Sequence, residues 1–114
     1  MSYSVEFDDT ALDDLEEIRA YLSEHSAKAY PQFLTALENR ISLIENNPRL
    51  YKSFEHNPAY RRMGLDYGFV AFYSIDDDDE IIGVRTIVHG TRNIVTYMNG
   101  LEKRKHPPES DQDG

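Results

Sequence analysis

The feature that most constrains the fold of this chain is a series of three β-type segments in its second half. Each segment is rich in β-branched and aromatic residues, and each is followed by glycine or aspartate. Asp66 and Gly68 favour a turn after the first segment, and the run Asp76–Asp79 favours another after the second. Short turns of this kind join antiparallel strands. The second half therefore predicts a three-stranded antiparallel sheet, with strands over Tyr60–Leu65, Tyr67–Ile75 and Ile81–His89.

The first half has a helical pattern that follows one short strand. Residues 3–7 alternate between apolar and polar side chains, which predicts a strand. Asp8 and Asp9 then offer capping oxygens to a helix whose apolar residues recur every three or four positions. A second helix of the same kind has Pro31 in its first turn and ends at Asn46-Asn47-Pro48. Two amphipathic helices with a short connection predict an antiparallel hairpin.

Together these segments predict an α+β fold in the order β-α-α-β-β-β. The helical hairpin is expected to lie across the antiparallel sheet, with the first strand at an edge of the sheet or beside its last strand. Phe69, Phe72 and Tyr73 are expected in the core and in cross-strand packing. Arg49–Pro58 has no clear period and is expected to be a loop. Arg92–Leu101 fits a short final strand or a frayed helix, and the pattern leaves both open.

The composition indicates a single globular domain. At 114 residues the chain can bury a core unaided, and we expect one domain over residues 1–101 and a disordered polar tail over residues 102–114. The absence of cysteine excludes a disulfide framework and a thiolate zinc site, and the four histidines lack metal-ligand spacing. No metal or cofactor is therefore expected. The chain shows no long apolar run and no signal peptide, which predicts a cytoplasmic protein without membrane association.

The charge is distributed unevenly along the chain. The net charge is −9, and residues 1–47 carry three bases against ten acids. Residues 48–75 and 81–100 each carry a net charge of +2, separated by the five acids of Asp76–Glu80. Because phosphate neutralisation drives most nucleic-acid affinity, a pI near 4.7 argues against strong independent binding to DNA or RNA. A local basic patch on the sheet remains compatible with these numbers.

Four side chains at the end of the predicted sheet are candidates for partner binding. Arg61 and Arg62 are adjacent in a strand and so point to opposite faces; one is expected to face a partner, and the other to pair with an acid such as Glu38 or Asp66. Arg92 follows a glycine turn, where it can reach a partner or anchor to the acidic face of the hairpin. A lone histidine at a strand end is more often a hydrogen-bonded rim residue than a base or ligand. The predicted partner-binding residues are Arg61, Arg62, His89 and Arg92.

The order and spacing of several short segments resemble the RelE/ParE superfamily of toxins from type II toxin–antitoxin systems. The resemblance covers roughly residues 3–97. It rests on YSVEF at the start, Ala11 with Asp14–Ile18 and Tyr21-Leu22, Leu43–Pro48, Tyr60–Arg62, Phe72–Asp76, and Val88–Asn93. The resemblance implies a toxin that a cognate antitoxin holds inactive by wrapping it with extended and helical segments.

Members of this superfamily divide by target. RelE-like toxins enter the ribosome and cleave mRNA with lysine and arginine residues, often with a tyrosine or histidine near the C-terminus, whereas ParE-like toxins lack that set and poison DNA gyrase. RelE-like members typically carry a base early in the strand that corresponds to Tyr67–Ile75. Here that position falls near Phe69 or Val70, and neither is basic. The resemblance therefore favours the ParE-like branch, with DNA gyrase and an antitoxin as partners and no assigned catalytic residue.

Two alternatives stay open. In the first, the chain is a ribosome-dependent mRNA endonuclease that uses Arg61, Arg62, Arg92 and Tyr97 for phosphate stabilisation and proton transfer. In the second, it is a non-toxic relative that only supports assembly with a partner. The depleted set of cations makes an enzymatic function the less favoured of these interpretations.

Overall fold

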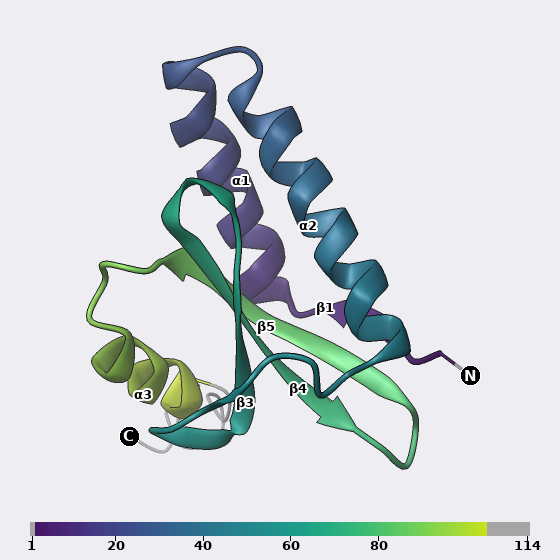
Figure 1. Cartoon of the computed structure of the whole chain (residues 1–114). Helices are drawn as coiled ribbons and strands as arrows, with labels where there is room; N and C mark the ends of the chain where they lie inside the picture. Colours follow the sequence, from purple (N-terminus) through teal and green to yellow (C-terminus); the bar gives the residue numbers. More distant parts are fainter. Residues whose placement is uncertain (1, 105–114) are drawn as a thin grey trace.

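A helical hairpin packs on one face of a five-stranded mixed sheet, and a third helix packs on the other face (Figure 1). The structure is a computed structural model, and it describes residues 2–104. In chain order the elements are β1 Ser4–Phe7, α1 Asp9–His25, α2 Ala29–Asn46, β2 Ser53–Phe54, β3 Asn57–Gly64, the 3-10 turn η1 Asp66–Gly68, β4 Phe69–Asp76, β5 Ile81–His89 and α3 Ile94–Arg104. The α+β class is confirmed. The predicted tail lies, from residue 105 onward, outside the described residues.

The sheet contains the three predicted antiparallel strands together with two more. Its strand order is β1-β5-β4-β3-β2, and β1 runs parallel to β5 with Ser4 opposite Ile81. The first strand therefore lies both at an edge and beside the last strand, as expected. The prediction of a three-stranded antiparallel sheet was wrong in this detail. Strand β2 lies inside the predicted loop Arg49–Pro58. It has two residues, which is too few to show an alternation of apolar and polar side chains.

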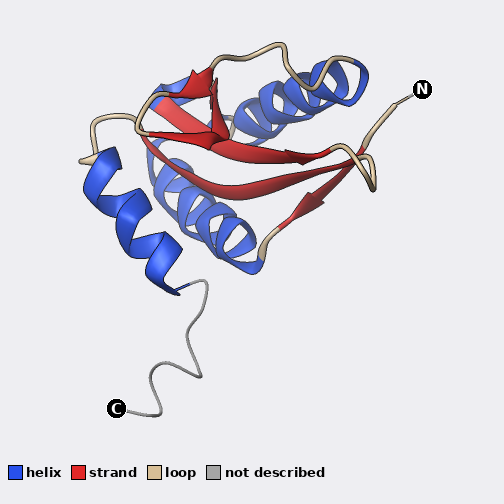
Figure 2. Ribbon diagram, turned by 90° about the horizontal axis from the view of Figure 1, so that it is seen from below, coloured by secondary structure: helices blue, strands red, loops and turns tan. Residues whose placement is uncertain are grey.

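Strand β4 separates two hydrophobic clusters because its successive side chains point to opposite faces. Phe69 and Tyr73 pack with the hairpin, and Phe72 packs with α3. All three are buried, which confirms their predicted place in the core. Figure 2 shows α3 set apart from the two hairpin helices.

The hairpin forms as the sequence predicts, with one difference at its start. Pro31 lies in the first turn of α2, and α2 ends at Asn46, ahead of the proline that closes the segment. Asp8 occupies the N-cap position of α1, but its side chain makes no capping hydrogen bond. Its carboxylate instead accepts a hydrogen bond from Arg85 Nη1 at 3.2 Å. The capping role predicted for Asp8 was therefore wrong.

A β-bulge in β5 changes which residues face each helix. Phe72 lies opposite Thr86, and the next residue of β4, Tyr73, lies opposite Val84, so Arg85 has no partner across the strands. The extra residue lets Val84 and Ile87 both pack against the hairpin despite their odd spacing. Arg85 and Thr86 are consequently buried polar residues in the centre of the fold.

Residues 94–104 form a helix, which decides between the two conformations that the sequence left open. Ile94, Met98 and Leu101 are spaced as one face of a helix and are buried in the second hydrophobic cluster. Within residues 2–104, no helix has both the length and the apolar character needed to cross a bilayer.

Candidate functional site

An open groove of about 490 Å³ lies between helix α1 and the C-terminal end of β5. Its lining combines carboxylates from α1, apolar and aromatic side chains from the hairpin and the sheet, and polar residues from the turn after β5. The lining residues are Asp14, Glu17, Ile18, Tyr21, Phe69, Ile87, Val88, His89, Thr91 and Arg92. Two of the predicted partner-binding residues, His89 and Arg92, therefore belong to one concave surface.

Aromatic rings form one side of this groove. The rings of Tyr21 and Phe69 meet edge to face at 6.4 Å, and those of Phe69 and His89 do so at 5.3 Å. The His89 Nδ1 atom shares a hydrogen bond with Thr91 Oγ1 at 2.8 Å. His89 is thus a half-buried rim residue with a local partner, and its predicted role in partner binding stays a prediction.

A glycine is required beside His89. Gly68 has φ +79°, and a Cβ atom at this position would lie 2.8 Å from His89 Nε2. Gly90 N donates a hydrogen bond to Gly68 O at 2.8 Å, so the two turns are in direct contact. This contact fixes the C-terminal end of β5 and hence the rim of the groove.

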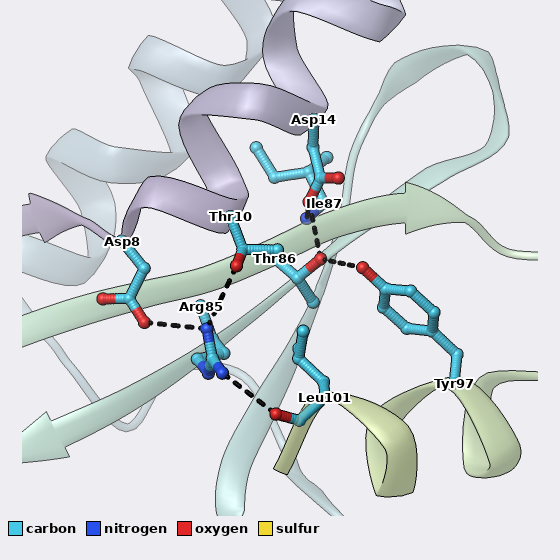
Figure 3. Close-up of polar contacts among 8 residues, drawn as sticks. All are labelled: Asp8, Thr10, Asp14, Arg85, Thr86, Ile87, Tyr97 and Leu101. Carbon is cyan, nitrogen blue, oxygen red and sulfur yellow. Dashed lines mark hydrogen bonds and ion pairs between the residues drawn. The ribbon is translucent and has the colours of Figure 1, made fainter. Parts of the chain in front are cut away.

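A chain of hydrogen bonds links α1, β5 and α3 at the floor of the groove (Figure 3). Thr86 Oγ1 donates to Asp14 Oδ2 at 2.5 Å, and Ile87 N donates to the same oxygen at 2.9 Å. Because the Thr86 proton points to the carboxylate, the Tyr97 hydroxyl donates to Thr86 Oγ1 at 2.9 Å. Burial raises the pKa of Asp14 above 3.8, although both hydrogen bonds favour the carboxylate form.

Arg92 lies over the ring of Tyr97, with Cζ 4.6 Å from the ring centroid. Within residues 2–104, Arg92 makes no ion pair with the acidic face of the hairpin, which was one of the two roles predicted for it. It makes a cation–π contact with Tyr97 of α3 instead. Its charge lowers the pKa of Asp14, which burial raises, and both residues line the same groove. Arg92 and Tyr97, two members of the alternative nuclease set, are therefore in contact.

Arg61 and Arg62 point to opposite faces, as predicted. Arg61 Nη1 donates to the backbone oxygen of Tyr51 at 2.7 Å. The expectation that it pairs with Glu38 or Asp66 was wrong, because a carbonyl of the neighbouring loop satisfies it and Asp66 lies 3.9 Å from Arg40 instead.

Arg62 is exposed and lines a second groove of about 540 Å³ beside β2 and β3. Its Nη2 atom lies 3.7 Å from the point where a Cβ of Gly90 would be, which brings it towards the turn that carries Arg92. Arg62 and Arg92 thus flank the same turn on the exposed surface, whereas Arg61 does not join them.

Arg85 was counted in the basic part of the sheet, but it is buried, with 8% of its surface exposed. Its guanidinium donates to Asp8 and to the backbone oxygen of Leu101, each at 3.2 Å (Figure 3). Its charge therefore holds α3 and the start of α1 to the sheet. In the described part of the chain, no three acidic or histidine side chains are grouped to hold a metal ion.

Asp14 was not predicted to be a structural centre, although its position in the sequence carries a signal. Asp14 follows Ala11 by three positions and precedes Ile18 by four, so it occupies the buried stripe of α1. An acid within an apolar stripe indicates a carboxylate that accepts hydrogen bonds in the interior. Its partner Thr86 could not be identified in the same way, because the bulge changes the face on which β5 residues lie.

Comparisons with known proteins agree with this fold. A family model described as "ParE toxin of type II toxin-antitoxin system, parDE" matches residues 5–94. A mutant E. coli toxin RelE in the free state superposes with a TM-score of 0.64 at 17% identity, covering 90% of this chain and 98% of that chain.

Two structures of toxin–antitoxin systems are also similar. The chromosomal ParDE system from P. aeruginosa gives a TM-score of 0.62 at 14% identity, with 77% of this chain and 96% of that chain covered. The intact E. coli RelBE toxin–antitoxin complex gives 0.57 at 17% identity, with the same coverages of 77% and 96%. No curated protein matches the chain. The superpositions show the shared fold. The family model, which spans most of the sequence, shows that the chain belongs to the ParE toxin family within the RelE/ParE superfamily of type II toxin–antitoxin toxins.

Proposed function

We propose that this chain is a toxin that stops growth by binding DNA gyrase and that a cognate antitoxin neutralises it. The observation that carries the proposal is the start of β4, where RelE-like toxins carry a base. Here Phe69 and Val70 occupy that position, and each is only 7% exposed. The strand contributes packing there and no cation. The match to the ParE model supports the same branch.

The positions of the remaining cations support a binding toxin over a nuclease. RNA cleavage needs a base, an acid and cations that converge on one phosphate. Arg61 is held by the carbonyl of Tyr51, which leaves Arg62 and Arg92 at the surface. The Tyr97 hydroxyl is already bonded to Thr86 and would have to leave that bond to transfer a proton. The contact between Arg92 and Tyr97 is the one observation that favours the endonuclease alternative.

The antitoxin part of the proposal rests on the family and on its relatives. The RelBE and ParDE structures that this fold resembles are toxin–antitoxin systems, and the RelBE structure is a complex. A gyrase target implies that the protein acts in the cytoplasm, as the sequence predicts. The acidic outer face of α1 suits an antitoxin with basic segments.

The test is induced expression of the chain without its antitoxin. The proposal predicts growth arrest, a DNA-damage response and altered supercoiling while bulk mRNA stays intact, and the purified chain should inhibit gyrase in a supercoiling assay. Rapid cleavage of translated mRNA would instead establish the endonuclease. Unimpaired growth would support the non-toxic alternative.

An arginine substitution separates the two toxic alternatives further. For an endonuclease, Arg92→Ala abolishes mRNA cleavage while antitoxin binding is largely retained. The matched control is Arg19→Ala, because Arg19 is an exposed arginine of α1 whose one ion pair among the described residues is with Glu16 in its own helix. The gyrase proposal stands if cells that express either variant show the same mRNA pattern as cells that express the wild-type chain. The control variant must also still inhibit gyrase.

A further inference from the structure

The groove beside α1 has an unbalanced set of charges. Its lining holds two carboxylates, Asp14 and Glu17, and one guanidinium, that of Arg92. Arg92 lies over the ring of Tyr97 and makes no ion pair with either carboxylate within the described residues. Within the described residues, no cation therefore pairs with the two carboxylates of this groove.

The two carboxylates still have free acceptor atoms. Both hydrogen bonds to Asp14 end on Oδ2, and neither Oδ1 nor the Glu17 carboxylate has a hydrogen-bond partner among residues 2–104. The charge of Glu17 raises the pKa of Asp14, and the charge of Arg92 lowers it. Two neighbouring like charges with open acceptors are stabilised when a donor with positive charge enters between them.

The rest of the groove suits the stem of a long basic side chain. Ile18, Phe69 and Val88 line the groove with apolar atoms although each is at most 7% exposed, and Tyr21, at 50% exposed, offers the larger surface at the rim. Arginine and lysine bury their methylene stems along such surfaces while the charged head reaches a polar group. Tyrosine attracts a cation over its face, and the planar guanidinium of arginine both stacks on rings and pairs with carboxylates through two hydrogen bonds.

From this charge complementarity we propose that the groove takes an arginine from an amphipathic segment of the antitoxin, with the guanidinium at Asp14 and Glu17 and the stem against Ile18 and Tyr21. The inference rests on the proposed function and deepens it, because it names the chemistry by which the antitoxin holds this face. A phosphate-bearing occupant is disfavoured, since two carboxylates repel it.

The test compares two charge reversals on the same helix, Glu17→Lys inside the groove and Glu24→Lys outside it. Both residues are exposed and have no hydrogen-bond partner in the described part of the chain, so both variants should fold. The probe is the cognate antitoxin, titrated calorimetrically onto the purified chain. We expect Glu17→Lys to weaken binding by about 10-fold or more and Glu24→Lys to change it by less than about 3-fold. Equal affinities for the two variants overturn the proposal.

A reciprocal substitution identifies the incoming residue. Each arginine of the antitoxin is replaced in turn by glutamate and tested against Glu17→Lys. Recovery of affinity with one of these replacements supports the proposed pair, whereas no recovery across the whole set overturns it. Growth arrest by the chain without its antitoxin is measured in a separate assay. Absence of growth arrest contradicts the proposed function, whereas the affinities decide whether the groove takes an arginine of the antitoxin.

Discussion

The hydrogen-bond chain through Thr86 gives the sharpest test of how α1, β5 and α3 are held together. Thr86 is fully buried, donates to the half-buried carboxylate of Asp14 and accepts from the hydroxyl of Tyr97. Thr86→Val keeps the shape of the side chain and removes its hydroxyl. The variant therefore tests the hydrogen bonds without opening a cavity.

The expected loss of stability follows from the charge of the acceptor. A hydrogen bond to a charged group contributes about 1.5–3 kcal/mol, and the half-buried Tyr97 hydroxyl can turn to water, which adds little. We therefore expect the free energy of unfolding to fall by about 2 kcal/mol. For a chain of this size that corresponds to a decrease in Tm of about 8 °C.

The loss should also depend on pH. The Thr86 hydrogen bond lowers the pKa of Asp14, so its removal raises that pKa further in the folded state. A raised carboxyl pKa costs stability as pH rises through it, so the difference between wild type and variant should be largest near neutral pH and shrink in acid.

The measurement is urea unfolding of wild type and Thr86→Val at neutral pH and at the lowest pH where both stay folded. Thr96→Val is the matched control, because Thr96 is exposed on α3 and its side chain has no hydrogen-bond partner in the described residues. A loss that is equal at both pH values, or no larger than that of the control, would refute the assignment of this hydrogen bond to a charged carboxylate.

Three further predictions concern single positions. Gly68→Ala should lower the free energy of unfolding by about 1–2 kcal/mol, because φ is +79° and the new Cβ meets His89. Gly100→Ala has open space at its Cβ and should raise the free energy of unfolding by up to about 1 kcal/mol. Chemical denaturation measures both changes. Asp14→Asn should become more stable relative to wild type as pH rises above 3.8, because the pKa of Asp14 is raised in the folded state and its ionisation costs stability. Melting curves over a pH series test this, and a difference in Tm that falls with rising pH contradicts it. Asp77→Asn should lose stability near neutral pH but not in acid, because an arginine lowers the folded pKa of Asp77; added salt should reduce the difference measured by thermal melting.

Local patterns predicted most of the fold because the two hairpin helices each have a clear apolar face and because β4 and β5 are short apolar runs. Both strands are largely buried on their two faces, and the turns next to them carry glycine and aspartate. Strand β2 escaped prediction because its pairing depends on β3, with Ser53 opposite Arg61, and two residues show no period. The α3 helix was ambiguous because its apolar residues fit either period until the second cluster selects one face.

The site was less predictable because it depends on contacts between distant residues. The sequence placed His89 and Arg92 near each other, since only the short turn separates them. Asp14 lies 72 positions before Thr86, and only the packing of α1 on the bulged strand brings them together. Spacing along the chain contains no information on such a contact, although the acid in the apolar stripe of α1 marks one of its two partners.

Burial and local hydrogen bonds reduce the number of positive charges that are available at the end of the sheet. Arg61, Arg62, Arg85 and Arg92 all count as positive charge in the sequence, but Arg85 is buried and Arg61 is held by a backbone carbonyl. Only Arg62 and Arg92 of these four are exposed. Binding of nucleic acid through two cations would change with salt by a slope of only about −2 in a double-logarithmic plot, which corresponds to weak electrostatic attraction. With the acidic groove beside them, these two arginines offer little attraction to a polyanion, which agrees with the proposal of a protein target.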